Sequence, residues 1–189
     1  MEKRFRDESI RMPNWDYGSN SSYFITINTA DHTCYFGDII DNKMNHSCSG
    51  RIAEDLWKEI PVLFSYAKID SFVIMPNHIH GIITIDKPSK SFIDFKTLSL
   101  ISALQIDKIS AQHGGITGMK NPMLNDNISR IIRWFKGRCS FEIHKIDKNF
   151  QWQSRFHDRL IRTPESYGRI SRYIENNPAN WKKNKWFKK

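Results

Sequence analysis

Two apolar segments near the middle of the chain, SFVIM and HIHGIITI, are separated only by Pro76 and Asn77. Short runs that are rich in β-branched residues and bounded by polar turn residues are typical of buried strands. A Pro-Asn pair between two such runs favours a tight turn. The pattern therefore predicts strands over residues 67–75 and 78–85, paired as an antiparallel hairpin.

Strand and helix patterns also precede this hairpin. The segment YFITINT at residues 23–29 predicts the first strand, and residues 34–40 predict a short extension or hairpin. Apolar positions recur at helical spacing over residues 51–64, with Ser49 as the expected cap. Residues 1–18 follow neither period and predict an irregular N-terminal arm.

The chain after the hairpin begins with its least regular segment. Residues 87–126 predict a long irregular excursion. One apolar stripe then predicts an amphipathic helix over residues 128–143, and alternation predicts a strand over residues 155–162. Thr163 and Pro164 favour the cap and the first position of a last helix, which Pro178 should end.

The candidate chemistry of the central hairpin is a pair of histidines. Side chains two residues apart in a strand point to the same face, so His78 and His80 should lie side by side. Two neutral imidazoles on a stiff strand form a two-point clamp for a divalent cation. A histidine pair on a half-buried strand can also face solvent, so the pair alone leaves metal binding open.

Composition limits the class of protein. The 189 residues suit a single domain over residues 1–189 that buries a core without disulfides. The three cysteines are odd in number and have no CxxC spacing, which argues against a disulfide framework or a thiolate zinc site. No apolar run is long enough to span a membrane, and no signal-type segment begins the chain, so we expect a cytoplasmic protein without membrane partners.

Positive charge is concentrated in the last third of the chain. Residues 1–126 carry 13 Lys and Arg against 15 Asp and Glu, whereas residues 127–189 carry 16 against 5. Such asymmetry favours a polyanionic partner, most simply nucleic acid, although a solvated basic surface is the alternative. The basic tail at residues 182–189 also contains aromatic residues, which suits single-stranded nucleic acid. Candidate DNA contacts are Arg130, Arg133, Lys136, Arg138, Arg162, Lys182, Lys183 and Lys185.

The last predicted helix carries a tyrosine and an asparagine four residues apart. Tyr173 and Asn177 therefore share one face of this helix, beside the apolar face formed by Tyr167, Ile170 and Ile174. From spacing alone, a packed core tyrosine is the simpler interpretation of Tyr173.

Five segments occur in a particular order: WDYGSNSSYFITINT, FVIMPNHIHGIITI, IIRWFKG, WQSRFHDRLIR and YIENNP. In these motifs the chain resembles the single-tyrosine HUH transposases, specifically the REP-associated tyrosine transposases and their insertion-sequence relatives. The resemblance implies an α+β fold: a ferredoxin-like or RRM-like palm with an antiparallel sheet, helices on one face and a C-terminal catalytic helix. Residues 87–126 have no counterpart in it.

The same resemblance implies roles for four residues. His78 and His80 match the metal ligands, Tyr173 matches the nucleophile, and Asn177 matches the polar residue that completes the metal site. The implied reaction is attack of the tyrosine on phosphorus, giving a 5′-phosphotyrosine link and a free 3′-OH. Two imidazole nitrogens and an amide oxygen suit Mg²⁺ or Mn²⁺. Pro178 biases the residue before it, Asn177, away from helical geometry.

The implied partner is single-stranded DNA with hairpins in a prokaryotic cell. Two other functions stay open at this point: a palm domain that binds single-stranded nucleic acid without cutting it, and an HUH replication or conjugation nickase. Homodimer and monomer are both compatible with the sequence, which contains no coiled-coil pattern.

Overall fold

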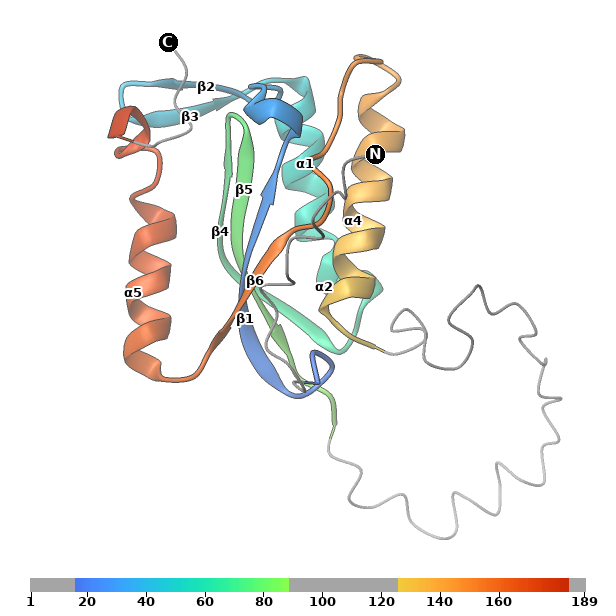
Figure 1. Cartoon of the computed structure of the whole chain (residues 1–189), viewed down its shortest axis with the longest axis vertical. Helices are drawn as coiled ribbons and strands as arrows, with labels where there is room; N and C mark the ends of the chain where they lie inside the picture. The colour runs from blue at the N-terminus through green and yellow to red at the C-terminus, as the bar shows by residue number, and fades with distance from the viewer. Residues whose placement is uncertain (1–15, 89–125, 184–189) are drawn as a thin grey trace, which may run out of the picture.

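The computed structural model describes residues 16–88 and 126–183. Its centre is a four-stranded antiparallel sheet in the order β4-β5-β1-β6 (Figure 1). In that order the strands are Ala67–Met75, His78–Ile85, Ser21–Asn28 and His157–Ile161. The predicted central hairpin is confirmed with its predicted bounds, and it supplies the adjacent strands β4 and β5.

Helices cover both faces of this sheet (Figure 1). On one face, α1 and α4 pack against each other around the large core cluster, for example through the Trp57 and Phe135 rings at 5.1 Å. On the other face lies α5, whose Ile174 packs with Ile82 and Ile161. The helices are α1 (Cys48–Lys58), α2 (Ile60–Leu63), α4 (Ile128–Ile143) and α5 (Pro164–Glu175).

Side-chain alternation along β5 divides its residues between these two layers. Ile79 and Ile83 belong to the core beneath α1 and α4, whereas Ile82 belongs to the small cluster beneath α5. His78 and His80 have the parity of Ile82, so they lie on the α5 face. The predicted palm, with helices on one face and a further C-terminal helix, is therefore confirmed, and α5 occupies the opposite face.

The predicted helix over residues 51–64 is wrong in its start, its cap and its continuity. The helix begins at Cys48, and Ser47 rather than Ser49 caps it, with the Ser47 hydroxyl accepting from the Gly50 N–H. It also divides into α1 and α2 at Glu59. Pro61 explains the break, because a proline has no N–H to continue the helical hydrogen bonds.

A second, two-stranded sheet was only partly predicted. It pairs β2 (Gly37–Ile40) with β3 (Lys43–His46). Strand β2 therefore starts later than the predicted residue 34, and β3 lies in a polar segment for which no strand was predicted. Asp41 and Asn42 join the strands with φ of 49° and 62°. Both residue types tolerate this left-handed conformation, which two-residue hairpin turns require.

The predicted strand at residues 155–162 is confirmed as β6, and the last helix has the predicted cap and first residue, Thr163 and Pro164. Short 3-10 helices occur at Ala30–His32 and Trp181–Lys183. The predicted arm, excursion and basic tail lie largely outside the described residues. Within residues 16–88 and 126–183, no helix combines the length and apolar character that crossing a bilayer requires.

Candidate tyrosine and metal site

The first and third residues of β5 bring two imidazoles together. His78 and His80 are 0% and 3% exposed, and their ring centroids lie 4.6 Å apart. Their shared face is the one that α5 covers. The predicted side-by-side arrangement is therefore present, in a buried rather than a solvent-facing position.

Each ring is held at its Nδ1 atom. His78 Nδ1 lies 2.7 Å from Asn77 Oδ1, and the other end of that amide donates from Nδ2 to the carbonyl of His32 at 3.0 Å. Because a backbone carbonyl only accepts, the Asn77 amide must present its oxygen to His78. His78 then carries its proton on Nδ1 and has a lone pair on Nε2.

The second ring is oriented by the neighbouring strand. In the β1–β5 register Thr26 lies opposite His80, and Thr26 Oγ1 is 2.8 Å from His80 Nδ1. Phe24, two residues earlier on the same face, stacks on the His80 ring at 5.2 Å. Both imidazoles are therefore fixed at Nδ1, as histidine ligands of metals usually are, and this leaves the Nε2 atoms for other contacts.

Helix α5 places Tyr173 over His80. The Tyr173 hydroxyl lies 3.3 Å from His80 Nε2, and the ring packs edge-on against Phe24. Tyr173 is 49% exposed, so it is not a packed core tyrosine. Its hydroxyl is thus next to the imidazole pair, on a residue that is half exposed to solvent.

Asn177 reaches the site from beyond the end of α5. The helix ends at Glu175 and the chain turns there, with the Asn177 N–H donating to the Ile174 carbonyl at 3.1 Å. This turn buries the Asn177 side chain next to His78, where its hydrogen bonding acts to raise the pKa of His78. Trp181 also lies beside His78, with the two ring centroids 6.0 Å apart.

Burial keeps both imidazoles neutral. Loss of solvation lowers the pKa of His78 well below its usual value, with His80 and His32 adding to the effect. Burial likewise lowers the pKa of His80 to about 4. At neutral pH both rings therefore have a lone pair and no charge, which is the form that binds metals.

The donor set fits a divalent cation of intermediate hardness. The part of the chain that the structure describes contains no cluster of three or more His, Cys, Asp or Glu suited to a metal. The site instead combines the imidazoles of His78 and His80 with the amide of Asn177, and both His78 Nε2 and Asn177 Oδ1 are buried. Two nitrogens and one oxygen on neutral groups match Mn²⁺ or Mg²⁺ and leave positions for phosphate oxygens.

Comparison with solved structures identifies the fold in which this site lies. A structure of a REP-associated tyrosine transposase bound to a REP hairpin matches with a TM-score of 0.57 and 17% identity, over 94% of this chain and 76% of the other. The chain has the fold of the REP-associated tyrosine transposases. No family model matches it.

The chain also has a clear sequence relative. An uncharacterized protein of Haemophilus influenzae (strain ATCC 51907 / DSM 11121 / KW20 / Rd) is 33% identical over 180 residues, which are 95% of this chain and 92% of the relative. The two proteins belong to one family.

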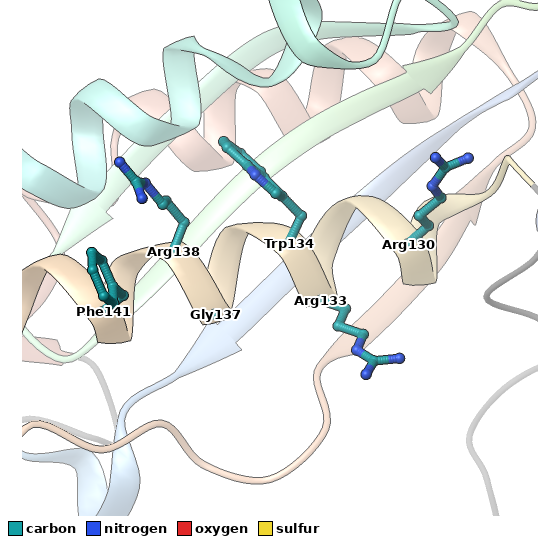
Figure 2. Close-up of a pocket in the computed structure, with 6 residues that line it drawn as sticks. All are labelled: Arg130, Arg133, Trp134, Gly137, Arg138 and Phe141. Atoms are coloured by element: carbon teal, nitrogen blue, oxygen red, sulfur yellow. The ribbon is translucent and has the colours of Figure 1, made fainter. Parts of the chain in front are cut away.

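In this transposase fold, the predicted basic residues do not form a single surface. Arg130 and Arg138 line a groove of about 470 Å³ on α4, together with Trp134 and Phe141. Arg133 also lines this groove, although its side chain points away from those of Arg130 and Arg138 in Figure 2. The groove lies on the face of the sheet opposite Tyr173, since α4 and α5 cover opposite faces.

Lys136 has an internal role. Its ammonium group donates to the carbonyls of Gln153 and Arg155 at 2.7 and 2.9 Å, and burial lowers its pKa. It therefore holds the loop before β6, and a phosphate contact by Lys136 stays a prediction.

The remaining basic candidates lie elsewhere. Arg162 lines a cavity of about 380 Å³ at the start of α5, beside Tyr167. Lys182 is exposed, Lys183 ends the last 3-10 helix, and Lys185 lies outside the described residues.

Several residues of the site were not predicted. Thr26, Asn77 and Trp181 contact the two imidazoles, and Asn28 lies opposite His78 in the sheet. The sequence does contain a signal for Asn77, because this residue directly precedes His78. For the others, the contact depends on strand register and on the path of the chain after α5.

Proposed function

We propose that this protein cleaves and rejoins single-stranded DNA that carries hairpins, through a covalent link to Tyr173. The observation that supports this most is Tyr173, a half-exposed residue whose hydroxyl lies 3.3 Å from Nε2 of a buried, neutral His80. A tyrosine that served only packing would not need to lie against a buried imidazole pair while remaining open to solvent. The hairpin-bound transposase of the same fold supports hairpin DNA as the substrate class.

In the proposed reaction the Tyr173 oxygen attacks the scissile phosphorus. The Tyr173 hydroxyl loses its proton as its oxygen bonds to phosphorus, the bond from phosphorus to the 3′ oxygen breaks, and the 3′ oxygen takes a proton and leaves as a hydroxyl. A 3′-OH can later reverse the attack, so strand transfer needs no ATP. In each step one phosphate ester bond forms and one breaks, so the number of phosphodiester links does not change.

The protein's contribution is placement. Helix α5 holds the Tyr173 hydroxyl beside the site, and the Phe24 ring limits the motion of both Tyr173 and His80. His80 and His78, fixed by Thr26 and Asn77, would hold the cation together with Asn177. A bound Mg²⁺ or Mn²⁺ would polarise phosphate oxygens and stabilise the charge that develops on them.

One chain supplies every residue of this site. The nucleophile and the three candidate ligands come from β5, α5 and the turn after α5 of the same molecule. We therefore propose that a monomer is sufficient for cleavage.

The α4 groove is the proposed second contact with DNA. It places two guanidinium groups beside Trp134 and Phe141, and Phe141 already lies 5.4 Å from Arg138. Arginines bind phosphates without reading sequence, and exposed aromatic rings stack on unpaired bases.

The test is formation of a protein–DNA adduct. Labelled hairpin-bearing single strands are incubated with Mn²⁺ or Mg²⁺ and resolved on denaturing gels, with mass analysis of the adduct. We expect an adduct with wild type and none with Tyr173→Phe or His78→Ala. Tyr167→Phe is the matched control, because Tyr167 lies on the same helix but bonds to Asp70 away from the site.

Two results would contradict the proposal. Binding of several hairpins without any adduct would identify a palm domain that does not cut DNA. An adduct that persists in Tyr173→Phe would show that another residue is the nucleophile.

A further inference from the structure

We propose that Asn28 is a further oxygen donor of the metal site, held in place by Gln153. This inference rests on the proposed function, since it extends the site formed by His78, His80 and Asn177. Asn28 is the last residue of β1, on the strand next to the two histidines.

Strand register puts the Asn28 side chain beside His78. In the β1–β5 pairing Thr26 lies opposite His80 and Asn28 lies opposite His78. Directly opposed residues in antiparallel strands project to the same face, with Cβ atoms about 5 Å apart. The Thr26–His80 contact of 2.8 Å shows the same arrangement two residues further along the strands. Asn28 therefore points to the α5 face, beside the imidazole of His78, which also interacts with Asn177.

The Asn28 amide has one satisfied end and one unsatisfied end. Its Nδ2 donates to Gln153 Oε1 at 2.9 Å, which turns Oδ1 away from Gln153. Asn28 is only 5% exposed, and its Oδ1 is buried and accepts no hydrogen bond from the described residues. Buried amide oxygens are normally paired, and each exception requires an explanation. A cation held by the adjacent imidazoles would supply the missing partner.

Gln153 is itself firmly held. Its N–H donates to the Asn28 carbonyl at 2.9 Å, so backbone and side chain both bind the same residue. Its carbonyl accepts from Lys136 on α4 at 2.7 Å, and the neighbouring Trp152 indole donates to the Lys136 carbonyl. The orientation of the Asn28 amide is therefore set by a rigid helix on the opposite side of the sheet. Gln153 is a positioning residue.

The added donor suits the proposed ions. With Asn28 the set becomes two imidazole nitrogens and two amide oxygens, and amide oxygens favour hard cations such as Mg²⁺ and Mn²⁺. All four groups are uncharged, so phosphate oxygens in the remaining positions would supply the negative charge.

Binding of Mn²⁺ to the DNA-free protein tests this without any measurement of activity. Electron paramagnetic resonance of free Mn²⁺ gives the affinity for wild type, Asn28→Leu, Asn28→Asp, Gln153→Leu and His78→Ala. We expect Asn28→Leu to weaken binding by about tenfold or more, since loss of groups at and around metal ligands has effects of about 10–100-fold. Asn28→Asp should bind as tightly as wild type or more tightly, because it keeps the oxygen and adds charge. Gln153→Leu should fall between wild type and Asn28→Leu.

Asn20→Leu is the matched control. Asn20 precedes the other end of β1 and bonds to Lys87, so its loss should disturb the sheet without changing Mn²⁺ affinity. Circular dichroism and thermal melting in EDTA establish that each variant is folded. If Asn28→Leu does not fold, the comparison of Asn28→Asp and Gln153→Leu with wild type still decides the question.

The outcomes separate this inference from the proposed function. Wild-type affinity in Asn28→Leu, with binding lost in His78→Ala, would overturn the role of Asn28 alone. Weaker binding in Asn28→Asp than in wild type would also overturn it, because a carboxylate keeps an oxygen at this position and the Gln153 amide can turn to donate to it. No saturable binding by wild type, or equal binding by His78→Ala, would overturn the metal site itself.

Discussion

Burial at individual residues sets the chemistry of the site. His78 and His80 differ from surface histidines because the sheet and α5 remove them from water, which favours their neutral form. Their Nδ1 contacts with Asn77 and Thr26 then decide where each ring points. The neutral state of both rings is thus a property of the folded protein, and it implies a dependence of stability on pH.

We predict that the metal-free protein loses stability as the pH falls from about 6.5 towards 4. The pKa of each histidine is lower in the folded state, so the unfolded chain binds more protons over this range and acid favours unfolding. For His80 alone, a change of pKa from 6.5 to about 4 corresponds to about 3 kcal/mol.

Urea unfolding in EDTA at several pH values measures this dependence. His80→Gln removes one of the two groups and should flatten the curve between pH 6.5 and 4. An equally steep curve in that variant would contradict the prediction.

At the scale of elements, the approach of α1 to the sheet depends on one glycine. A Cβ atom at Gly81 would overlap the ring of Trp57, which is fully buried. Gly81 lies next to His80, so any displacement of β5 there would also move the site. The close contact between helix and strand thus requires a residue without a side chain.

We expect Gly81→Ala to destabilise the protein by about 1–3 kcal/mol, the usual cost of overpacking a core. Gly168→Ala is the matched control, because a Cβ atom at position 168 meets nothing within 4 Å and Gly168 lies inside α5. That substitution should stabilise by about 0.5–1 kcal/mol through helix propensity. Chemical denaturation of both variants gives the two values. Similar effects of the same sign would show that Trp57 does not make this contact.

At the scale of the whole molecule, the candidate site and the arginine groove lie on opposite sides of one sheet. Tyr173 lies on α5 and the two imidazoles lie on the sheet face that α5 covers, whereas the arginine groove lies on α4. Helices α5 and α4 lie on opposite sides of the sheet (Figure 1). Lys136, Gln153 and Asn28 form a chain of contacts from α4 to the α5 face. The arginines are separated from the chemistry, so substitutions there should change DNA affinity and not metal binding.

We predict that Arg138→Gln and Arg130→Gln each weaken binding of hairpin DNA about threefold to tenfold and each lower the slope of log affinity against log salt concentration by about one. Mn²⁺ affinity should be unchanged. Lys68→Gln on β4 is the control, since Lys68 pairs with Asp86 and should leave DNA affinity unaltered. Fluorescence anisotropy over a range of salt concentrations provides the measurement. Unchanged affinity in both arginine variants would remove α4 from the DNA-binding surface.

The periodic elements were predictable because their signals are local. The strands over residues 67–75 and 78–85 and the helix over residues 128–143 have the bounds that their apolar patterns predict. The start of α1 was missed because Ser47 and Ser49 are both acceptable caps by type, and only the contact of Ser47 with the Tyr35 carbonyl distinguishes them. The β2–β3 hairpin was missed in part because its strands are short and polar.

The sequence by itself determined that two histidines share a face of a buried strand and that Tyr173 lies on one face of the last helix, since both follow from local periodicity. Asn177 was predicted on that same helix face, but it lies in the turn beyond Glu175, where α5 ends. Only the tertiary structure decided that these faces meet, with Tyr173 at His80 and Asn177 at His78. It also decided that Thr26 and Asn28 lie opposite the histidines. The physical reason is that strand register and the choice of sheet face are fixed by long-range burial, which no local pattern encodes.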